Sequence, residues 1–171
     1  MSVIAALTKR MIAYPGSSPR DAAHLLKVWA YAKTIGELEA LDARTQEILE
    51  IAALTHDIAC PLCRQKYGRA AAPLQEKEGV PLVRALLEDM GLSQEIIDRT
   101  AFLVGHHHTL SAVDGMDFQI LIEADYLVNA DESRYSPDAI RTFHAHHFRT
   151  QTGKALLHSL FPDSFLSENK F

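Results

Sequence analysis

An apolar helical run that ends in two adjacent ionisable residues constrains this chain more than any other feature. Leu54 and Thr55 close the run, and His56 and Asp57 follow them directly. Two neighbouring ionisable side chains are costly to bury unless they are paired, hydrogen-bonded or bound to a cation. The rest of the fold must therefore supply partners for this pair, and a bound metal ion is the solution that would also support chemistry.

The remainder of the chain is typical of a succession of helices. Apolar residues recur at spacings of three and four, and no stretch shows the sustained alternation of a strand. A chain of 171 residues with 47% hydrophobic content can bury one sizeable core, so we expect a single all-α domain. Caps and apolar phase place the helices at about 3–13, 18–38, 42–58, 74–90 or 81–90, 93–104, 117–129, from 136 and 153–160, with loops at 60–73 and 108–117.

Helical phase turns several polar side chains toward the core. His24 borders the apolar stripe of its helix, and His56 continues an apolar row at spacings of three and four. Among the three histidines 106–108, phase favours His107, and Asp125 falls in the middle of an apolar row. Imidazole nitrogen and carboxylate oxygen suit a divalent ion, and ligands on packed helices can converge inside a bundle. The pattern predicts a metal site, with Mn, Mg, Fe, Co, Ni or Zn all open as its occupant.

Composition excludes some partners. A formal net charge of -5 argues against a nucleic-acid polymer, because binding to phosphate backbones requires clustered Lys and Arg. No run approaches the roughly 18 apolar residues of a membrane span, so we expect no membrane insertion and a cytoplasmic protein. Two cysteines, Cys60 and Cys63, make no disulfide framework and are interpreted as ordinary thiols in a reducing compartment.

The ligand candidates, taken in order, resemble a known family. His24, then His56-Asp57, then Asp125 are similar to the H…HD…D signature of the HD-domain superfamily of metal-dependent phosphohydrolases, over about residues 18–131. The resemblance implies a compact multi-helix HD-domain fold in which these four residues hold a central metal ion. It makes residues 1–171 one HD-type domain with a C-terminal helical extension over 136–171. It also implies hydrolysis of a nucleotide or a small phosphate ester.

Two departures from the family affect the site. Many relatives continue the HD dipeptide as HDIGK, and some nucleotidases carry a glutamate three residues after the aspartate; Cys60 stands at that position here. Members with two metals add a histidine that corresponds to Gln75 in this chain. A second metal site formed by Asp57, His106 or His107, with Glu76 as a further donor, stays open as an alternative.

General chemistry assigns roles to these residues. A bound divalent ion lowers the pKa of a water and polarises a phosphoryl oxygen. Asp57 is the expected catalytic residue that holds the attacking water, and His106 or His107 would stabilise charge or protonate the leaving group. Lys66 and Arg20 are the candidates for binding the phosphate of a small phosphorylated substrate.

Two other functions remain alternatives to hydrolysis. Some HD-domain proteins hold two irons and activate O₂, which requires a filled second site. A catalytically weak member would instead bind a nucleotide or regulate a partner. A homodimer is also left open, because the tail 161–171, with three phenylalanines, is expected to pack on the domain or on a second copy.

Overall fold

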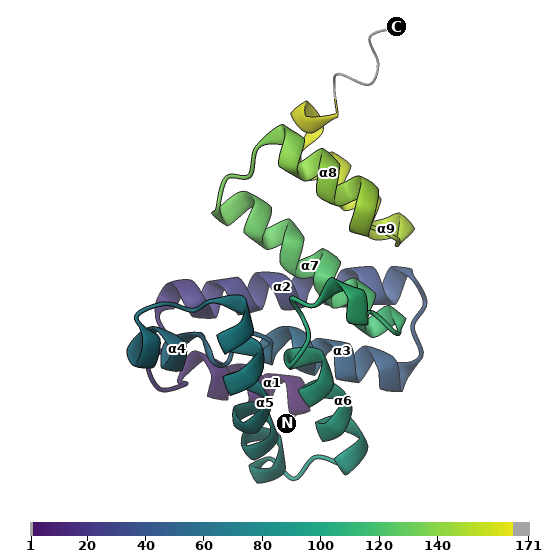
Figure 1. Ribbon diagram of the computed structural model, residues 1–171. Helices are drawn as coiled ribbons and strands as arrows, with labels where there is room; N and C mark the ends of the chain where they lie inside the picture. The colour runs from purple at the N-terminus through teal and green to yellow at the C-terminus, as the bar shows by residue number, and fades with distance from the viewer. Residues whose placement is uncertain (1, 166–171) are drawn as a thin grey trace, which may run out of the picture.

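The helical periodicity of the sequence is confirmed along the part of the chain that the structure describes. The computed structural model describes residues 2–165, and every regular element within them is a helix. The elements, shown in Figure 1, are α1 (Val3–Ile12), α2 (Pro19–Leu38), α3 (Ala43–Thr55), α4 (Cys60–Tyr67), α5 (Ala72–Asp89), α6 (Gln94–Val104), η1 (Leu110–Ala112), α7 (Met116–Glu132), α8 (Pro137–His147), α9 (Gln151–Leu160) and η2 (Pro162–Ser164).

Local capping explains where the helices that carry the site begin. Ser18 accepts a hydrogen bond from the backbone N–H of Asp21, whose carboxylate accepts one from the backbone N–H of Ser18, and this capping box starts α2. The side chain of Asp42 accepts hydrogen bonds from the first backbone N–H groups of α3. α3 then ends at Thr55, so that His56 is its C-cap.

The segment after the HD pair differs from the sequence-based expectation. The sequence predicts a loop over 60–73, but Cys60–Tyr67 form the short helix α4. Pro61 occupies its first turn, where the missing N–H removes no helical hydrogen bond, and Gly68 ends it with a φ of 70°. Cys60 and Cys63 are buried and free, so packing against the domain stabilises a helix that is too short to be stable alone.

Three crossing helices position the site. α2 packs against both α3 and α7, and α3 packs against α6 and α7. In Figure 1, α7 crosses α2 and continues away from the layer of α2 and α3 toward α8 and α9. α7 ends at Glu132, three residues beyond the predicted end, and this extra turn matters for the site. None of the described helices is long and apolar enough to cross a membrane.

A buried carboxylate attaches the C-terminal helices to α7. Glu123 accepts hydrogen bonds from the backbone N–H groups of Arg149 and Thr150, at 2.6 and 3.0 Å. Beyond α9, the ring of Phe165 stacks on that of His158 with centroids 3.9 Å apart. The remainder of the predicted tail, 166–171, lies outside the described residues.

Candidate metal centre

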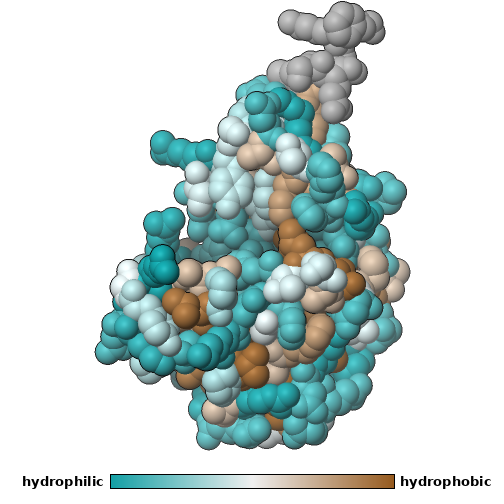
Figure 2. Space-filling view, in the orientation of Figure 1, coloured by the Kyte–Doolittle hydropathy of each residue, from teal (hydrophilic) through white to brown (hydrophobic). Residues whose placement is uncertain are grey.

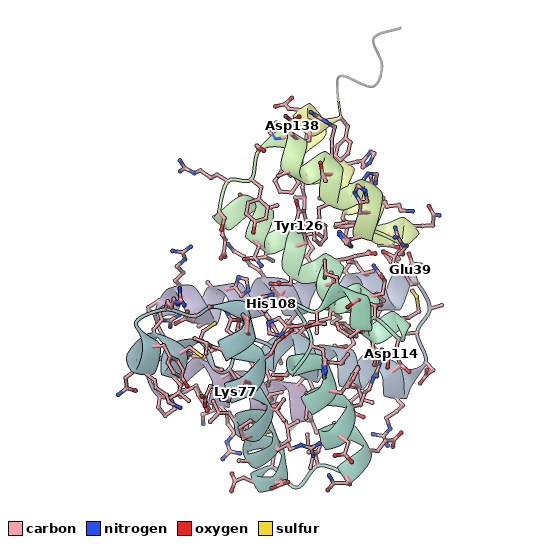
Figure 3. The ribbon with its side chains drawn as sticks, viewed as in Figure 1. Glu39, Lys77, His108, Asp114, Tyr126 and Asp138 are labelled. Carbon is pink, nitrogen blue, oxygen red and sulfur yellow. The ribbon has the colours of Figure 1, made fainter. Side chains whose placement is uncertain are left out.

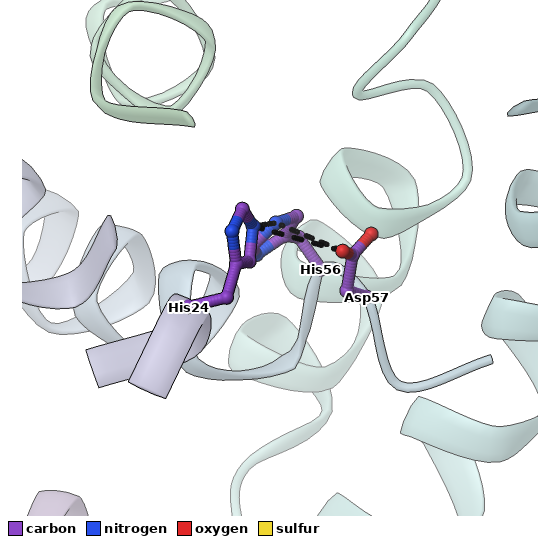
Figure 4. A group of neighbouring side chains, drawn as sticks. All are labelled: His24, His56 and Asp57. Carbon is purple, nitrogen blue, oxygen red and sulfur yellow. Dashed lines mark hydrogen bonds and ion pairs between the residues drawn. The ribbon is translucent and has the colours of Figure 1, made fainter. Parts of the chain in front are cut away.

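Three of the sequence-predicted ligands come together where α2 meets the end of α3. His24 projects from α2, and His56 and Asp57 follow α3 (Figure 4). The Nε2 atoms of the two histidines are 3.3 Å apart, and Asp57 Oδ2 lies 3.7 Å from His24 Nε2 and 3.8 Å from His56 Nε2. His24 and His56 are 8% and 1% exposed, so these atoms are largely shielded from water.

The fourth predicted ligand closes the group from α7. Asp125 Oδ1 lies 3.2 Å from His24 Nε2 and 3.4 Å from His56 Nε2. The same oxygen accepts a hydrogen bond of 2.8 Å from the side-chain amide of Asn129, one turn further along α7. Four donor atoms from three separate segments therefore converge on one point.

The hydrogen bonds of the histidines leave the right atoms available for a metal ion. His56 Nδ1 donates to the carbonyl oxygen of Ala53, and His24 Nδ1 lies 3.1 Å from Glu132 Oε2. A carbonyl can only accept, so neutral His56 carries a lone pair on Nε2, the atom that faces the cluster. Donor atoms about 2.1 Å from one ion lie about 3.0 to 3.4 Å apart, which matches the Nε2–Nε2 separation. The residues present fit a divalent ion.

Electrostatics support this fit. Burial alone would lower the pKa of His24, but Asp125 and Asp57 outweigh it and raise this pKa to about 9. Burial alone would raise the pKa of Asp125 and of Asp57, yet the neighbouring histidines hold both well below the usual range. The two carboxylates therefore keep their negative charge. In the metal-free protein this charge favours a protonated His24, and a bound cation would take the place of that proton.

A second donor group shares Asp57. His107 Nε2 lies 3.6 Å from Asp57 Oδ1, and His107 Nδ1 is within 2.8 Å of the carbonyl oxygen of Val104. Among the described residues, His107 Nε2 is buried with no hydrogen-bond partner. The ligand atoms of Asp57, His107 and His108 lie within 4.8 Å of one another, and His108 Nε2 is 3.2 Å from Gln75 Oε1. Asp57 therefore presents Oδ2 to His24 and His56 and Oδ1 to His107.

Two cavities reach these ligands, and Asn129 lines both of them. The first, of about 460 Å³, reaches His24 and Asp57 and is walled by α2, α4 and the 16–18 segment. It carries two cationic side chains, Arg20 and Arg64. The second, of about 740 Å³, reaches Asp125, His107 and His108 and runs between α7 and α8. Both cavities therefore contain candidate metal ligands among their lining residues.

A comparison with models of known protein families identifies the domain. The family model for the HD domain matches residues 21–154. This chain belongs to the HD-domain family.

The solved structures add support for the HD-domain fold. A crystal structure of a predicted HD superfamily hydrolase from an uncultured Thermotogales bacterium superposes with a TM-score of 0.64 at 22% identity. The alignment covers 96% of this chain and 90% of that one. The search of curated proteins gives no match.

Cys60 is buried close to Asp57. Burial and the nearby carboxylate of Asp57 raise the pKa of its thiol, so the thiol stays protonated at neutral pH. The residue that stands where relatives carry a lysine or a glutamate is therefore a neutral thiol close to a candidate ligand.

The structure does not bring two of the predicted residues to the HD site. The Nδ1 of His106 lies 2.8 Å from the carbonyl oxygen of Phe102, and its ring stacks on the ring of Phe102. Lys66 is exposed on α4, where its ammonium group lies 2.9 Å from Glu78 Oε1, and it lines neither of the two cavities. Arg20 does line the first cavity.

Several residues of the site escaped the sequence reasoning. Asn129 follows Asp125 by four residues within the predicted helix, so the helical phase of Asp125 indicates it. Glu132 follows Asp125 by seven residues on the same face but lies beyond the predicted helix end. Glu76, a predicted further donor, instead accepts hydrogen bonds from the backbone N–H of His108 and the hydroxyl of Thr109.

Proposed function

We propose that this HD-domain protein hydrolyses a small phosphate ester in the space formed by the two cavities. The observation that carries the proposal is the convergence of four donor atoms, from His24, His56, Asp57 and Asp125, beside a cavity that contains an unpaired cation. Arg20 makes no ion pair with any residue of 2–165, and it is therefore free to bind phosphate oxygens.

A divalent ion held by these four residues would lower the pKa of a water and polarise a phosphoryl oxygen. The chain supplies the remaining functions. Asp57 faces both donor groups and, with its low pKa, accepts a hydrogen bond from the attacking water and orients it. The neutral thiol of Cys60 lies close to this carboxylate and does not compete with it for the water proton.

Phosphate binding is assigned to the first cavity rather than to Lys66. Arg64 lines this cavity and forms an ion pair of 2.6 Å with Asp21, which holds its guanidinium in place. Arg20 precedes His24 by one turn of α2 and lines the same wall. Two guanidinium groups beside the ligand group give a phosphate dianion charge-assisted hydrogen bonds.

The second donor group favours one alternative function. Asp57, His107 and His108 provide ligand atoms for a further ion, and an HD protein with two irons could activate O₂. The two functions differ in metal content and in the substrate consumed. A content of two irons per chain together with O₂ uptake would refute the hydrolase proposal and support the oxygenase.

The test joins metal analysis to a panel of nucleotides and phosphomonoesters. We expect phosphate release with at least one divalent ion, and a loss of more than about 100-fold in Asp57→Ala, because even outer-shell substitutions cost about 10- to 100-fold. Asp131→Ala, which removes an exposed carboxylate from α7, is the matched control and should retain activity. Equal turnover in Asp57→Ala, or no turnover on the whole panel, would refute catalysis at this site.

A further inference from the structure

The second cavity extends the ligand group into an apolar space. It begins at Asp125, His107 and His108 and ends against side chains of α8 and of the turn that precedes it. Its volume of about 740 Å³ is within the range of cavities that bind small molecules. In Figure 3, His108 lies below α7, whereas Tyr126 lies on α7 toward α8 and Asp138 near the start of α8. The cavity therefore begins at the candidate metal ligands and extends along α7 toward α8.

Aromatic rings form the far wall of this cavity. The rings of Tyr126 and Phe143 stack with centroids 3.7 Å apart and an interplanar angle of 9°. The hydroxyl of Tyr126 donates to the carbonyl oxygen of Ala139 at 3.2 Å, which fixes this stack between α7 and α8. Tyr135, whose ring centroid lies 5.6 Å from that of Tyr126, is 40% exposed. Tyr126 is itself buried, so the half-buried Phe143 and the exposed Tyr135 are the rings that a planar ligand in the cavity can contact.

The two cavities differ in charge. Arg20 and Arg64 line the first cavity, whereas none of the described residues that line the second is a lysine or an arginine. The one carboxylate at its outer rim, Asp138, is paired with Arg141 of the same helix. An anionic phosphate is therefore favoured in the first cavity, and an uncharged group is favoured in the second. Figure 2 shows pale and brown side chains among the teal surface in the part of the molecule that contains α7 and α8.

We propose that the second cavity binds a planar aromatic ring on the leaving group of the substrate, while the phosphate lies at the metal ligands and Arg20. The inference rests on the proposed function and makes it narrower: the substrate is a phosphate ester whose alcohol carries an aryl group or a nucleobase. Tyr135 and Phe143 are the residues that would contact the ring, and Tyr126 would hold Phe143 in position.

The test compares substrates that differ only in the ring. Benzyl phosphate and cyclohexylmethyl phosphate have alkoxide leaving groups of similar basicity, and ethyl phosphate lacks a ring. With manganese as the metal, we expect kcat/KM to be roughly two- to tenfold higher for benzyl than for cyclohexylmethyl phosphate, from ring stacking. Adenosine 5′-monophosphate is compared with benzyl phosphate to separate a nucleobase from a simple aryl group. A higher kcat/KM for adenosine 5′-monophosphate would indicate a nucleobase, and a higher value for benzyl phosphate would indicate an aryl group.

A matched pair of substitutions on α8 locates the effect. Ala139 is exposed and lines the cavity, so Ala139→Trp should fill it and lower the benzyl-to-ethyl ratio of kcat/KM by about tenfold or more. Ala145 is exposed on the same helix and does not line the cavity, so Ala145→Trp should leave that ratio unchanged. An unchanged ratio in Ala139→Trp, or equal rates for the benzyl and cyclohexylmethyl esters, would overturn the inference.

A binding measurement separates this inference from the proposed function. The dissociation constants of benzylphosphonate and ethylphosphonate for the whole chain are measured by calorimetry, which requires no turnover. If no ester is hydrolysed but benzylphosphonate binds about tenfold more tightly than ethylphosphonate, and Ala139→Trp removes the difference, the aromatic site stands and the hydrolase proposal fails. Equal binding of the two phosphonates would refute the aromatic site, whatever the activity.

Discussion

Glu132 shows how the ligand group extends beyond the residues that would touch a metal ion. Its Oε2 lies 3.1 Å from His24 Nδ1, and its Oε1 lies 3.0 Å from the ammonium group of Lys27. A carboxylate behind a histidine fixes the tautomer that presents Nε2 to the ion and raises the basicity of the ring. Burial alone would raise the pKa of Glu132, but Lys27 and His24 lower it, so the carboxylate is charged at neutral pH.

Removing this carboxylate should weaken metal binding while leaving the ligands in place. We expect Glu132→Gln to lower the affinity for a divalent ion by about tenfold, and Glu132→Ala to lower it further, because outer-shell partners contribute about 10- to 100-fold. Competition with a chelator of known affinity measures the change. Asp131→Asn, at the exposed neighbouring position, should keep the wild-type affinity, and an equally tight Glu132→Ala would show that His24 needs no such support.

At the level of single residues, phase and order along the chain were sufficient to select His24, His56, Asp57 and Asp125, which the fold brings together. Among the histidines at 106–108, phase favours His107, and the structure places its Nε2 3.6 Å from Asp57 Oδ1, but phase does not single out His108. α6 ends at Val104 and Gly105 is its C-cap, so the following residues lie in a turn where helical spacing no longer decides direction. His107 and His108 both face Asp57 as a result, whereas His106 turns back onto Phe102.

Helix ends determine what could be predicted at the level of elements. α4 was missed because Pro61, Gly68 and its basic residues are typical of a loop, and the burial of Cys60 and Cys63 that stabilises it is a tertiary effect. α7 was predicted three residues too short because no residue after 129 gives a clear stop signal. α2 and α8 begin directly after Ser18 and Ser136, the caps that the sequence indicates, because these caps act locally. α5 and α9 each begin two residues before the earliest start that the sequence predicts.

The end of α2 contains a position where backbone strain can be tested. Ala40 has a φ of 57°, a left-handed conformation that costs a residue with a Cβ about 1–2 kcal/mol, and the following N–H bonds back to the carbonyl of Gly36. Ala40→Gly should therefore raise the free energy of unfolding by about 0.5–1 kcal/mol. The change in the free energy of unfolding is measured by urea denaturation, where the midpoint should shift and the m value should stay the same.

The same substitution in the middle of α2 is the control. Ala30 is exposed and helical, so Ala30→Gly should lower the free energy of unfolding by about 0.5–1 kcal/mol. Opposite signs at the two positions are expected because the only difference is the backbone conformation. A loss of stability in both variants would show that Ala40 is not strained.

For the whole molecule, the candidate site lies where helices distant in sequence are joined. His24 is on α2, His56 follows α3 and Asp125 is on α7, and these helices pack against one another. An ion bound at this point would connect all three, and an ion that binds only the folded chain stabilises it by mass action. The stability of the whole domain is therefore coupled to metal binding.

Metal removal should lower the melting temperature, and the effect should grow with pH. At 100 times its dissociation constant an ion adds about 2.7 kcal/mol, which corresponds to roughly 5–10 °C for a domain of this size. Folding raises the pKa of His24 from 6.5 to about 9. In the metal-free protein, protonated His24 therefore stabilises the folded state fully below pH 6.5, and this contribution to stability is lost as the pH rises through 9. A metal ion must displace the proton from His24, so the affinity for the ion increases as the pH rises from 6.5 to 9.

Melting curves with manganese and with a chelator, recorded from pH 6.5 to 9, test this coupling. The difference in melting temperature between the two samples should increase with pH in the wild-type chain and vanish in His24→Ala. His146→Ala, which removes an exposed histidine of α8, should behave as wild type and so excludes a general effect of losing an imidazole. A full metal-dependent shift in His24→Ala would mean that the ion binds elsewhere, because the four-ligand group cannot form without the donor from α2.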